Sequence, residues 1–284
     1  MKLIIQPDDG VAPVVRAIDR ARKAIDIVIF RFDRDEIEKA LHAAVARGVV
    51  VRALIAHTNK GGEKKLRKLE LRLLEGGATV ARTADDLTRY HGKMLIVDGR
   101  FLHVYGFNYT MLDIEKSRSF GIVTRDRKVV AEAIKLFEAD ALRQNYAPGH
   151  PRLVVSPENS RAVLTSFLKG ARKQLLIYDA QVSDNAIQKV LQERAKAGVE
   201  IRILGSLEKS LKSVKVRRLA DLRLHVRAII RDGKDAFIGS QSLRRLELEG
   251  RREVGIIIQN AAVVRKIQAV FETDWEKKSR KQVA

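Results

Sequence analysis

Residues 91–98 read HGKMLIVD, and residues 225–232 read HVRAIIRD. Both stretches hold a histidine, a basic residue two positions later and an aspartate five positions after that. In both, glycine follows the aspartate, and a glycine-containing segment comes further on, YGFN at 105–108 and GSQS at 239–242. This recurrence predicts that the chain has two related halves, each of which supplies one polar site.

The repeat extends well beyond these motifs. LIIQP at 3–7 matches LVVSP at 153–157, an offset of 150 residues, whereas from the motifs onward the offset is 134. The first half therefore carries 16 additional residues ahead of its motif. So long a period indicates a duplicated domain, because solenoid repeats span only about 20–50 residues. We expect a first domain over residues 1–147 and a second over 148–284, divided near the prolines and glycine of 148–151.

Each half reads as alternating helices and strands. In the first half, residues 14–23 and 36–47 have helical patterns, and the apolar runs at 25–30 and 49–55 are typical of buried strands. Asp98-Gly99 lies between two short apolar runs and favours a hairpin turn. The second half repeats this order. The alternation predicts an α/β fold with two tandem pseudo-symmetric domains, each a mixed sheet flanked by helices.

Composition narrows the class of protein. The chain has no cysteine, which excludes disulfides and thiolate metal sites. No apolar stretch approaches the ~20 residues that span a bilayer, and the N-terminal apolar residues meet polar ones too early for a signal peptide. We therefore expect a cytoplasmic protein, with peripheral attachment to the inner membrane surface left open. No obligate protein partner is implied.

Charge is the unusual property of this sequence. Its 55 basic and 35 acidic residues give a net charge of +20, which favours a polyanionic partner, either an anionic phospholipid surface or nucleic acid. Basic residues concentrate at 60–72 and 209–223, between the second strand of each half and its motif. From the pseudo-symmetry we expect both stretches to lie near one cleft.

The motifs suit phosphodiester chemistry. Alternation along a strand puts His91 on the same side as Lys93, and His225 on the same side as Arg227. Two cations can neutralise phosphate oxygens, while one imidazole attacks phosphorus and the other protonates the leaving oxygen. This scheme needs no metal ion or cofactor, and no acidic cluster adjoins the motifs.

These residues resemble the paired HKD motifs of the phospholipase D superfamily, and the resemblance covers most of both halves. It implies a metal-independent phosphodiesterase or phosphatidyltransferase whose two motifs form one active site at the domain interface. It assigns His91, Lys93, His225 and Arg227 as catalytic, with Lys93 and Arg227 also binding substrate. Among the branches of the superfamily, the chain is most similar to bacterial cardiolipin-synthase-like and phospholipase-D-like proteins.

The chain departs from the family pattern in several places. Arg227 stands where the family has lysine, and the Gly-Ser-x-Asn segment survives only as Asn108 in one half and Ser240 in the other. Glu253 matches the acidic residue that supports a histidine, but the first half has Ser119 at that position. Asp113 or Glu115 are the alternatives for the missing carboxylate.

Supporting roles are expected for further residues. Asp98 and Asp232 open tight turns, so we expect them to be mainly structural and to pair with nearby basic groups. Tyr90 adjoins His91 and is a candidate substrate contact. The four histidines outside the motifs, at positions 42, 57, 103 and 150, are expected to be structural or incidental.

Three functions remain open from the sequence. The first is an enzyme that hydrolyses or transfers phospholipid headgroups through a covalent phosphohistidine, with His91 as nucleophile and His225 as general acid. If Glu253 supports the histidine of its own half, it favours a protonated His225 and the acid role; if it reaches the other ring, it strengthens His91 as nucleophile. The two roles are reversed if His225 is the residue that is phosphorylated. The second is a nuclease of the same superfamily, and the third is a degenerate protein that binds phosphate or polyanions without turnover. The sequence does not decide whether the enzyme would hydrolyse the phosphodiester or transfer the group to an alcohol, and it does not give the oligomeric state.

Overall fold

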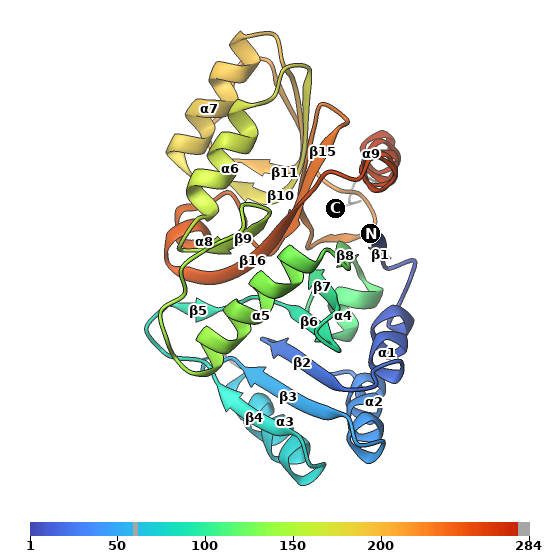
Figure 1. Cartoon of the computed structure of the whole chain (residues 1–284). Coiled ribbons are helices and arrows are strands. Elements are labelled where there is room, and N and C mark those ends of the chain that lie inside the picture. The colour runs from blue at the N-terminus through green and yellow to red at the C-terminus, as the bar shows by residue number, and fades with distance from the viewer. Residues whose placement is uncertain (59–61, 278–284) are drawn as a thin grey trace.

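The computed structural model describes residues 1–58 and 62–277. Two eight-stranded mixed sheets, one from each half, pack together with helices around them (Figure 1). The first sheet has the strand order β1-β8-β7-β6-β2-β3-β4, and its eighth strand, β13, pairs with β8. The second has the order β12-β11-β10-β14-β15-β16-β5, and its eighth strand, β9, pairs with β16. The α/β class with two tandem domains is therefore confirmed.

The elements of the first half run in the order of the predicted alternation. They are β1 (Lys2–Gln6), α1 (Ala12–Asp19), β2 (Ala24–Ile29), α2 (Asp35–Ala46), β3 (Val50–Ile55), α3 (Glu63–Glu75), β4 (Thr79–Arg82), β5 (Arg89–Tyr90), β6 (Met94–Val97), β7 (Phe101–Tyr105), α4 (Met111–Glu115), β8 (Ser117–Thr124) and α5 (Arg127–Ala141).

The second half repeats this order without a counterpart of α3. Its elements are β9 (Leu153–Ser156), α6 (Ser160–Lys169), β10 (Gln174–Val182), α7 (Asn185–Lys196), β11 (Glu200–Leu207), β12 (Val214–Arg217), β13 (Arg223–Leu224), β14 (Arg227–Arg231), β15 (Asp235–Gly239), α8 (Arg245–Glu249), β16 (Arg251–Ile258) and α9 (Ala261–Glu276). Helix α3 thus accounts for the additional residues of the first half. The proposed boundary between residues 147 and 148 lies in the segment that joins α5 to β9.

The hairpin after each motif forms as the dipeptide predicts. Asp98 and Gly99 have φ of 54° and 61°, and Asp232 and Gly233 have φ of 55° and 65°. Positive φ at both central residues is the requirement of a type I′ turn. The carboxylate of Asp98 accepts hydrogen bonds from the backbone N–H groups of residues 22–24, and that of Asp232 accepts them from residues 172–174. Both carboxylates thus hold the turn to a neighbouring backbone segment, and within the described residues neither forms the ion pair with a basic side chain that the sequence led us to expect.

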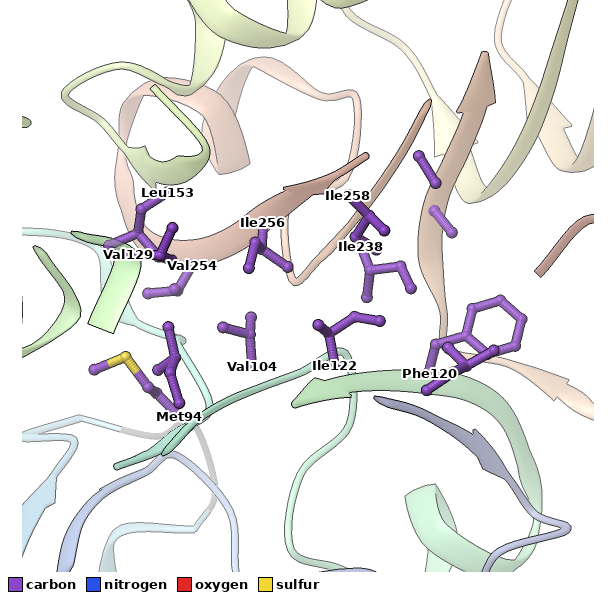
Figure 2. Packing of buried hydrophobic residues seen from close by; sticks show 14 of the residues in the cluster. Met94, Val104, Phe120, Ile122, Val129, Leu153, Ile238, Val254, Ile256 and Ile258 are labelled. Carbon is purple, nitrogen blue, oxygen red and sulfur yellow. The ribbon is translucent and has the colours of Figure 1, made fainter. Parts of the chain in front are cut away.

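The central core lies between the two sheets. Figure 2 shows Val104 and Ile122 of the first sheet facing Ile238 and Ile256 of the second, with Val129 of α5 at the edge of the same cluster. Residues of α5 and α9 belong to this cluster too, so both C-terminal helices of the halves help to join the sheets. A separate core lies on the outer side of each sheet, under α1 and α2 in one half and under α6 and α7 in the other.

A reciprocal exchange of strands links the halves. Strand β5, from the first half, pairs in parallel with β16 of the second sheet, and β13, from the second half, pairs in parallel with β8 of the first. Each exchanged strand directly precedes a motif histidine. The backbone N–H of His91 donates to the carbonyl of Arg252 at 2.7 Å, and that of His225 donates to the carbonyl of Arg118 at 3.3 Å. Each motif histidine is therefore anchored on the opposite half.

The two basic stretches do not gather as expected. Most of the first stretch forms α3, which packs beside β4 at the outer edge of the first sheet (Figure 1), while Lys60 lies outside the described residues. Arg72 of α3 forms an ion pair with Glu38. In the second stretch, Arg223 on β13 pairs with Asp113, next to a motif histidine. Because α3 has no counterpart in the second half, the two basic stretches do not occupy equivalent positions in the two halves.

Candidate active site

His91 is held on both ring nitrogens. Its Nδ1 lies 2.8 Å from the Oε2 of Glu253, and its Nε2 lies 2.8 Å from the Nζ of Lys93. An ammonium can only donate, so Nε2 accepts and the ring proton on Nδ1 is donated to the carboxylate. The face of the ring meets Phe30 edge-on, with centroids 4.4 Å apart. This arrangement fixes both the tautomer and the orientation of His91, and it leaves Nε2 basic.

The carboxylate that supports His91 comes from the other half. Glu253 lies on β16 and is fully buried. It reaches the histidine because β5 is paired to β16 just ahead of His91. The sequence identified Glu253 as a supporting residue but left open which histidine it contacts.

His225 is supported in the reciprocal sense. Its Nε2 lies 3.4 Å from the Oδ2 of Asp113, a buried residue of α4 in the first half. Asp113 is itself held by the backbone and side-chain N–H groups of Asn108 and by Arg223. Asp113, and not Glu115, therefore takes the position near the histidine that Ser119 leaves without a carboxylate. Glu115 instead pairs with Arg34.

The two motif cations are placed differently. Lys93 is completely buried, and its Nζ lies 5.4 Å from the centre of the Phe30 ring as well as against His91. Arg227 donates to the backbone carbonyls of residues 225 and 226, and its Nε lies 3.8 Å from Asp179. Sequence reasoning missed Asp179, because the equivalent position in the first half is Ile29 and the repeat therefore does not mark it.

The charged residue of each motif acts on the histidine of the other motif as well as on its own. Burial, followed by the charges of Lys93, Arg251 and Arg227, lowers the pKa of His91 well below its usual value. Burial also lowers the pKa of His225, where Asp113 acts against the shift and Lys93 and Arg227 add to it. Arg227 thus acts on the histidine of the first motif, and Lys93 on that of the second. Both shifts favour the neutral form of the imidazole.

Burial also shifts the pKa values of the two charged groups next to His91. It lowers the pKa of the Lys93 ammonium to about 7, against the opposing effect of Glu253 and Asp113. It raises the pKa of the Glu253 carboxyl to about 7, against the effect of Lys93 and Ser240. A buried cation next to two neutral imidazoles is an environment that favours an anion, since bound negative charge would stabilise the ammonium.

Further arginines surround the motifs. Arg251 donates to Glu247 and lies 3.9 Å from Glu253, and it pairs in strand register with Arg89. Burial, together with the charges of Arg251 and Arg31, lowers the pKa of Arg89. None of these arginines was singled out from the sequence, although Arg89 and Arg223 occupy equivalent positions two residues before each histidine. That equivalence was the available signal.

The remaining predicted site residues have supporting positions or lie elsewhere. Asn108 orients Asp113, and the Ser240 hydroxyl lies 3.1 Å from the backbone nitrogen of Val254 and influences Glu253. Tyr90 is directed away from the site: its hydroxyl donates to Asp86, and the Arg252 guanidinium covers its ring. Adjacent residues of an extended strand project to opposite sides, so the neighbour of His91 cannot share its direction.

Two features are absent from the described part of the chain. Residues 1–58 and 62–277 hold no group of three or more histidine, aspartate or glutamate side chains arranged to bind a metal ion. Within the same residues, no helix combines the length and apolar character needed to cross a bilayer.

Comparison with known families identifies the class of protein. The family model described as cardiolipin synthase, PLD-like domain, matches residues 14–141 and again residues 164–275. The chain therefore belongs to the phospholipase D superfamily and contains two copies of its domain.

Relatives of known name are similar over one part of the chain. The mitochondrial cardiolipin hydrolase of Homo sapiens is 26% identical over 131 residues, which is 46% of this chain and 50% of the relative. That of Danio rerio is 29% identical over 127 residues, or 42% of this chain and 53% of the relative. The chain thus matches about half the length of these relatives.

Solved structures extend the likeness to the whole fold. The polyphosphate kinase from Porphyromonas gingivalis superposes with a TM-score of 0.80 at 20% identity, covering 99% of this chain and 52% of the kinase. The phosphatidylserine synthase of Haemophilus influenzae superposes with a TM-score of 0.71 at 10% identity, covering 99% of this chain and 87% of the synthase. At these identities the likeness establishes the fold.

Proposed function

We propose that the protein is a phosphodiesterase or phosphatidyltransferase that acts on phospholipid headgroups through a covalent phosphohistidine at His91. The observation that carries this proposal is the placement of His91 between Glu253 and Lys93. Glu253 holds the Nδ1–H tautomer, so the lone pair of Nε2 is available. Lys93 is positioned to bind a phosphate oxygen beside that lone pair.

The first step transfers the phosphatidyl group to the protein. A phosphodiester entering the site takes over the hydrogen bond that Lys93 gives to His91, which frees Nε2 to attack phosphorus. The bond from phosphorus to the leaving alcohol breaks as the Nε2–phosphorus bond forms, and His225 gives a proton to the leaving oxygen. Lys93 and Arg227 stabilise the negative charge on the non-bridging oxygens.

The second step releases the group. His225, now neutral, takes a proton from water or from an alcohol, and the resulting nucleophile attacks phosphorus and displaces His91. Water gives hydrolysis and an alcohol gives transfer. His225 must be protonated for the first step, and the bound phosphate supplies the negative charge that raises its pKa from the low value of the empty site. Asp113 acts in the same direction.

Phospholipid is the favoured substrate class on three grounds. The matching family model is described as cardiolipin synthase, and the curated relatives are named as cardiolipin hydrolases. A phosphatidylserine synthase shares the fold over nearly the whole chain. A net charge of +20 would hold the protein at an anionic bilayer surface.

A nuclease is the second candidate, and the same charge of +20 favours it.

An assay without metal separates these functions. Vesicles of labelled phosphatidylglycerol or cardiolipin, and labelled single- and double-stranded DNA, are each incubated with the protein in EDTA. Release or transfer of the lipid headgroup, absent in His91→Ala, supports the proposal. Cleavage of DNA alone identifies the nuclease, and saturable binding of lipid or DNA with no product identifies a protein that binds phosphate without turnover.

A further inference from the structure

A cavity of about 370 Å³ lies in the first half, away from the motif histidines. It is enclosed by α1, by β1 and by the hairpin end of β6 and β7, and Asp98 and Phe101 form part of its wall. Lys93 and Asp98 stand at opposite ends of β6, which separates the cavity from the candidate active site by roughly 16 Å at about 3.3 Å per residue. The cavity is therefore a separate feature of the molecule.

The walls of the cavity combine an apolar lining with positive charge. Ile4, Val97 and Phe101 line it, and Lys2, Arg16, Arg20 and Arg125 are the cations around it. Arg125 lies over the ring of Phe101 at 5.9 Å, and none of the four forms an ion pair with a carboxylate among the described residues. The carboxylate of Asp98 is bonded to three backbone N–H groups and forms no ion pair with these cations, and its single negative charge leaves the lining with an excess of positive charge.

His103 is a buried polar group in this lining. It is 5% exposed, and its Nδ1 lies 2.9 Å from the hydroxyl of Tyr105. Burial, and secondarily Lys2, lowers the pKa of His103 to about 4, so the ring is neutral at pH 7. If the tyrosine hydroxyl donates to Nδ1, the ring proton lies on Nε2. The Nε2–H group can then donate a hydrogen bond to a molecule in the cavity. The catalytic scheme does not use this histidine.

The second half shows what the same position looks like without a cavity. Strand registers align the halves residue by residue: Leu95 pairs with His103 in one, and Ile229 pairs with Phe237 in the other. Phe237 thus replaces His103. By the same offsets Phe167 replaces Ala17 and Arg231 replaces Val97, and the Arg231 guanidinium lies 4.4 Å from the centre of the Phe167 ring. These larger side chains stand at the positions where the first half has the smaller residues that line its cavity.

The cations are specific to the first half as well. Ser166, Gly170 and Gln259 stand at the positions equivalent to Arg16, Arg20 and Arg125. Of the four, only Lys2 has a basic counterpart, Arg152, which is paired with Asp126. Small wall residues and unpaired cations thus occur together in one half, and both are missing from the other. Maintenance of the fold does not explain this difference, since the second half builds the same sheet and helix without them.

We infer that this cavity is a second binding site, for an amphiphilic anion that places a phosphate or carboxylate head among the arginines and an apolar body against Val97 and Phe101. The volume is at the lower end of the range for small-molecule sites, about 300–1,000 Å³. A head group alone would leave the apolar wall uncovered, and a neutral apolar molecule would form no ion pair with the cations, which are exposed at the rim of the cavity. A single-chain phosphate ester or medium-chain acid satisfies both, and so does one chain of an anionic lipid drawn from a bilayer.

Octyl phosphate, below its micellar concentration, is the probe for calorimetric titration of the whole protein, with inorganic phosphate and octyltrimethylammonium as comparison ligands. Ala17→Phe introduces the residue of the second half and should abolish the saturable binding of octyl phosphate, while phosphodiesterase activity and Tm stay near the wild-type values. His91→Ala, at the candidate active site, should retain the binding.

The charge is tested separately by Arg16→Ser and Arg20→Gly, which also copy the second half. Each should weaken octyl phosphate binding by about five-fold, as for loss of one charge-assisted contact. Arg127→Ser removes an exposed arginine outside the cavity and is the matched control, with no expected change. These surface variants keep the test decisive even if Ala17→Phe does not fold.

The source of the ligand is distinguished by sedimentation with phosphatidylglycerol vesicles. Loss of vesicle binding along with octyl phosphate binding in Ala17→Phe identifies a bilayer lipid, and loss of octyl phosphate alone identifies a free amphiphile. The inference is overturned if octyl phosphate does not bind saturably, if Ala17→Phe or both arginine variants bind it normally, if inorganic phosphate or the cationic amphiphile binds as well, or if His91→Ala removes the binding.

Discussion

Glu253 belongs to the second half of the chain, yet its carboxylate lies 2.8 Å from Nδ1 of His91 in the first half. The reciprocal relationship joins Asp113 of the first half to His225 of the second, at 3.4 Å. Each candidate catalytic histidine thus depends on an acid that its own half does not provide. The two contacts are unequal in length and in the element that supplies the acid, which gives the two histidines different environments.

Glu253→Gln should lower kcat by at least about 100-fold, because a neutral amide no longer enforces the tautomer that leaves Nε2 basic. The fold should persist, since the substitution keeps the size of the side chain. Steady-state rates on a phosphodiester substrate, with thermal unfolding as the folding control, measure this effect. A reduction in kcat of less than about three-fold in Glu253→Gln would show that Glu253 does not support the nucleophile.

His225→Ala should slow substrates with poor alcohol leaving groups far more than nitrophenyl esters, because a stable phenolate leaves without a proton. His91→Ala should abolish the turnover of both kinds. Asp113→Asn is the matched test of the acid and should show a weaker form of the His225→Ala pattern. If His91→Ala gives the selective loss and phosphate is trapped on the peptide around residue 225, the two roles are reversed.

Lys93→Met should abolish activity and yet raise stability below neutral pH. The pKa of Lys93 is lowered to about 7 in the folded protein, against about 10.5 in an unfolded chain. The penalty for burying its charge is therefore fully present below pH 7 and is relieved as pH rises from 7 toward 10.5, where only the unfolded state holds the proton.

The Tm difference between Lys93→Met and wild type should accordingly be several degrees at pH 6 and should shrink by pH 9. Arg127→Met, on the surface, provides the control for loss of a positive charge. If the Tm difference between Lys93→Met and wild type grows as the pH rises, its pH dependence has the opposite sign to the prediction. That result would exclude a lowered pKa for Lys93.

Asp98→Ala should destabilise the protein by about 2–3 kcal/mol, because it removes the acceptor of several backbone N–H groups and leaves alanine at a positive φ. Asp98→Asn should lower the free energy of unfolding by less, since asparagine tolerates the left-handed region. Urea unfolding measures both variants, and Asp232→Ala should behave as Asp98→Ala does. Rates per folded molecule should stay within about three-fold of wild type. A soluble, stable and inactive Asp98→Ala would point to a direct catalytic role.

The repeat was sufficient to predict the two domains, the hairpin turns and the place of the additional residues, which the structure shows to contain α3. Local chemistry dictates these features, since apolar runs form strands and Asp-Gly forms tight turns. The helix expected at 14–23 nevertheless ends at Asp19. The residues after it form the segment whose N–H groups bind Asp98, a long-range contact that a local pattern cannot reveal.

The partners of the histidines could not be predicted, because they depend on how strands cross between halves. Glu253 was identified by family position, but its assignment to His91 follows from the pairing of β5 with β16. The choice of Asp113 over Glu115 depends on α4, where Asp113 faces His225 and Glu115 pairs with Arg34. Tyr90 adjoins His91 in the sequence, but its hydroxyl binds Asp86 and its ring lies under Arg252, because adjacent residues of a strand project to opposite sides.

The exchange of β5 and β13 bears on how such a chain could evolve. In an assembly of two identical subunits with this geometry, positions 119 and 253 would hold the same residue, and one mutation to serine would remove both supporting acids together. Once the halves are joined in one polypeptide, each position can change alone. One copy has kept the glutamate while the other has serine with Asp113 nearby. Covalent joining of the halves thus lets the environments of the two histidines change independently, while loss of either half would remove the acid that contacts the histidine of the other.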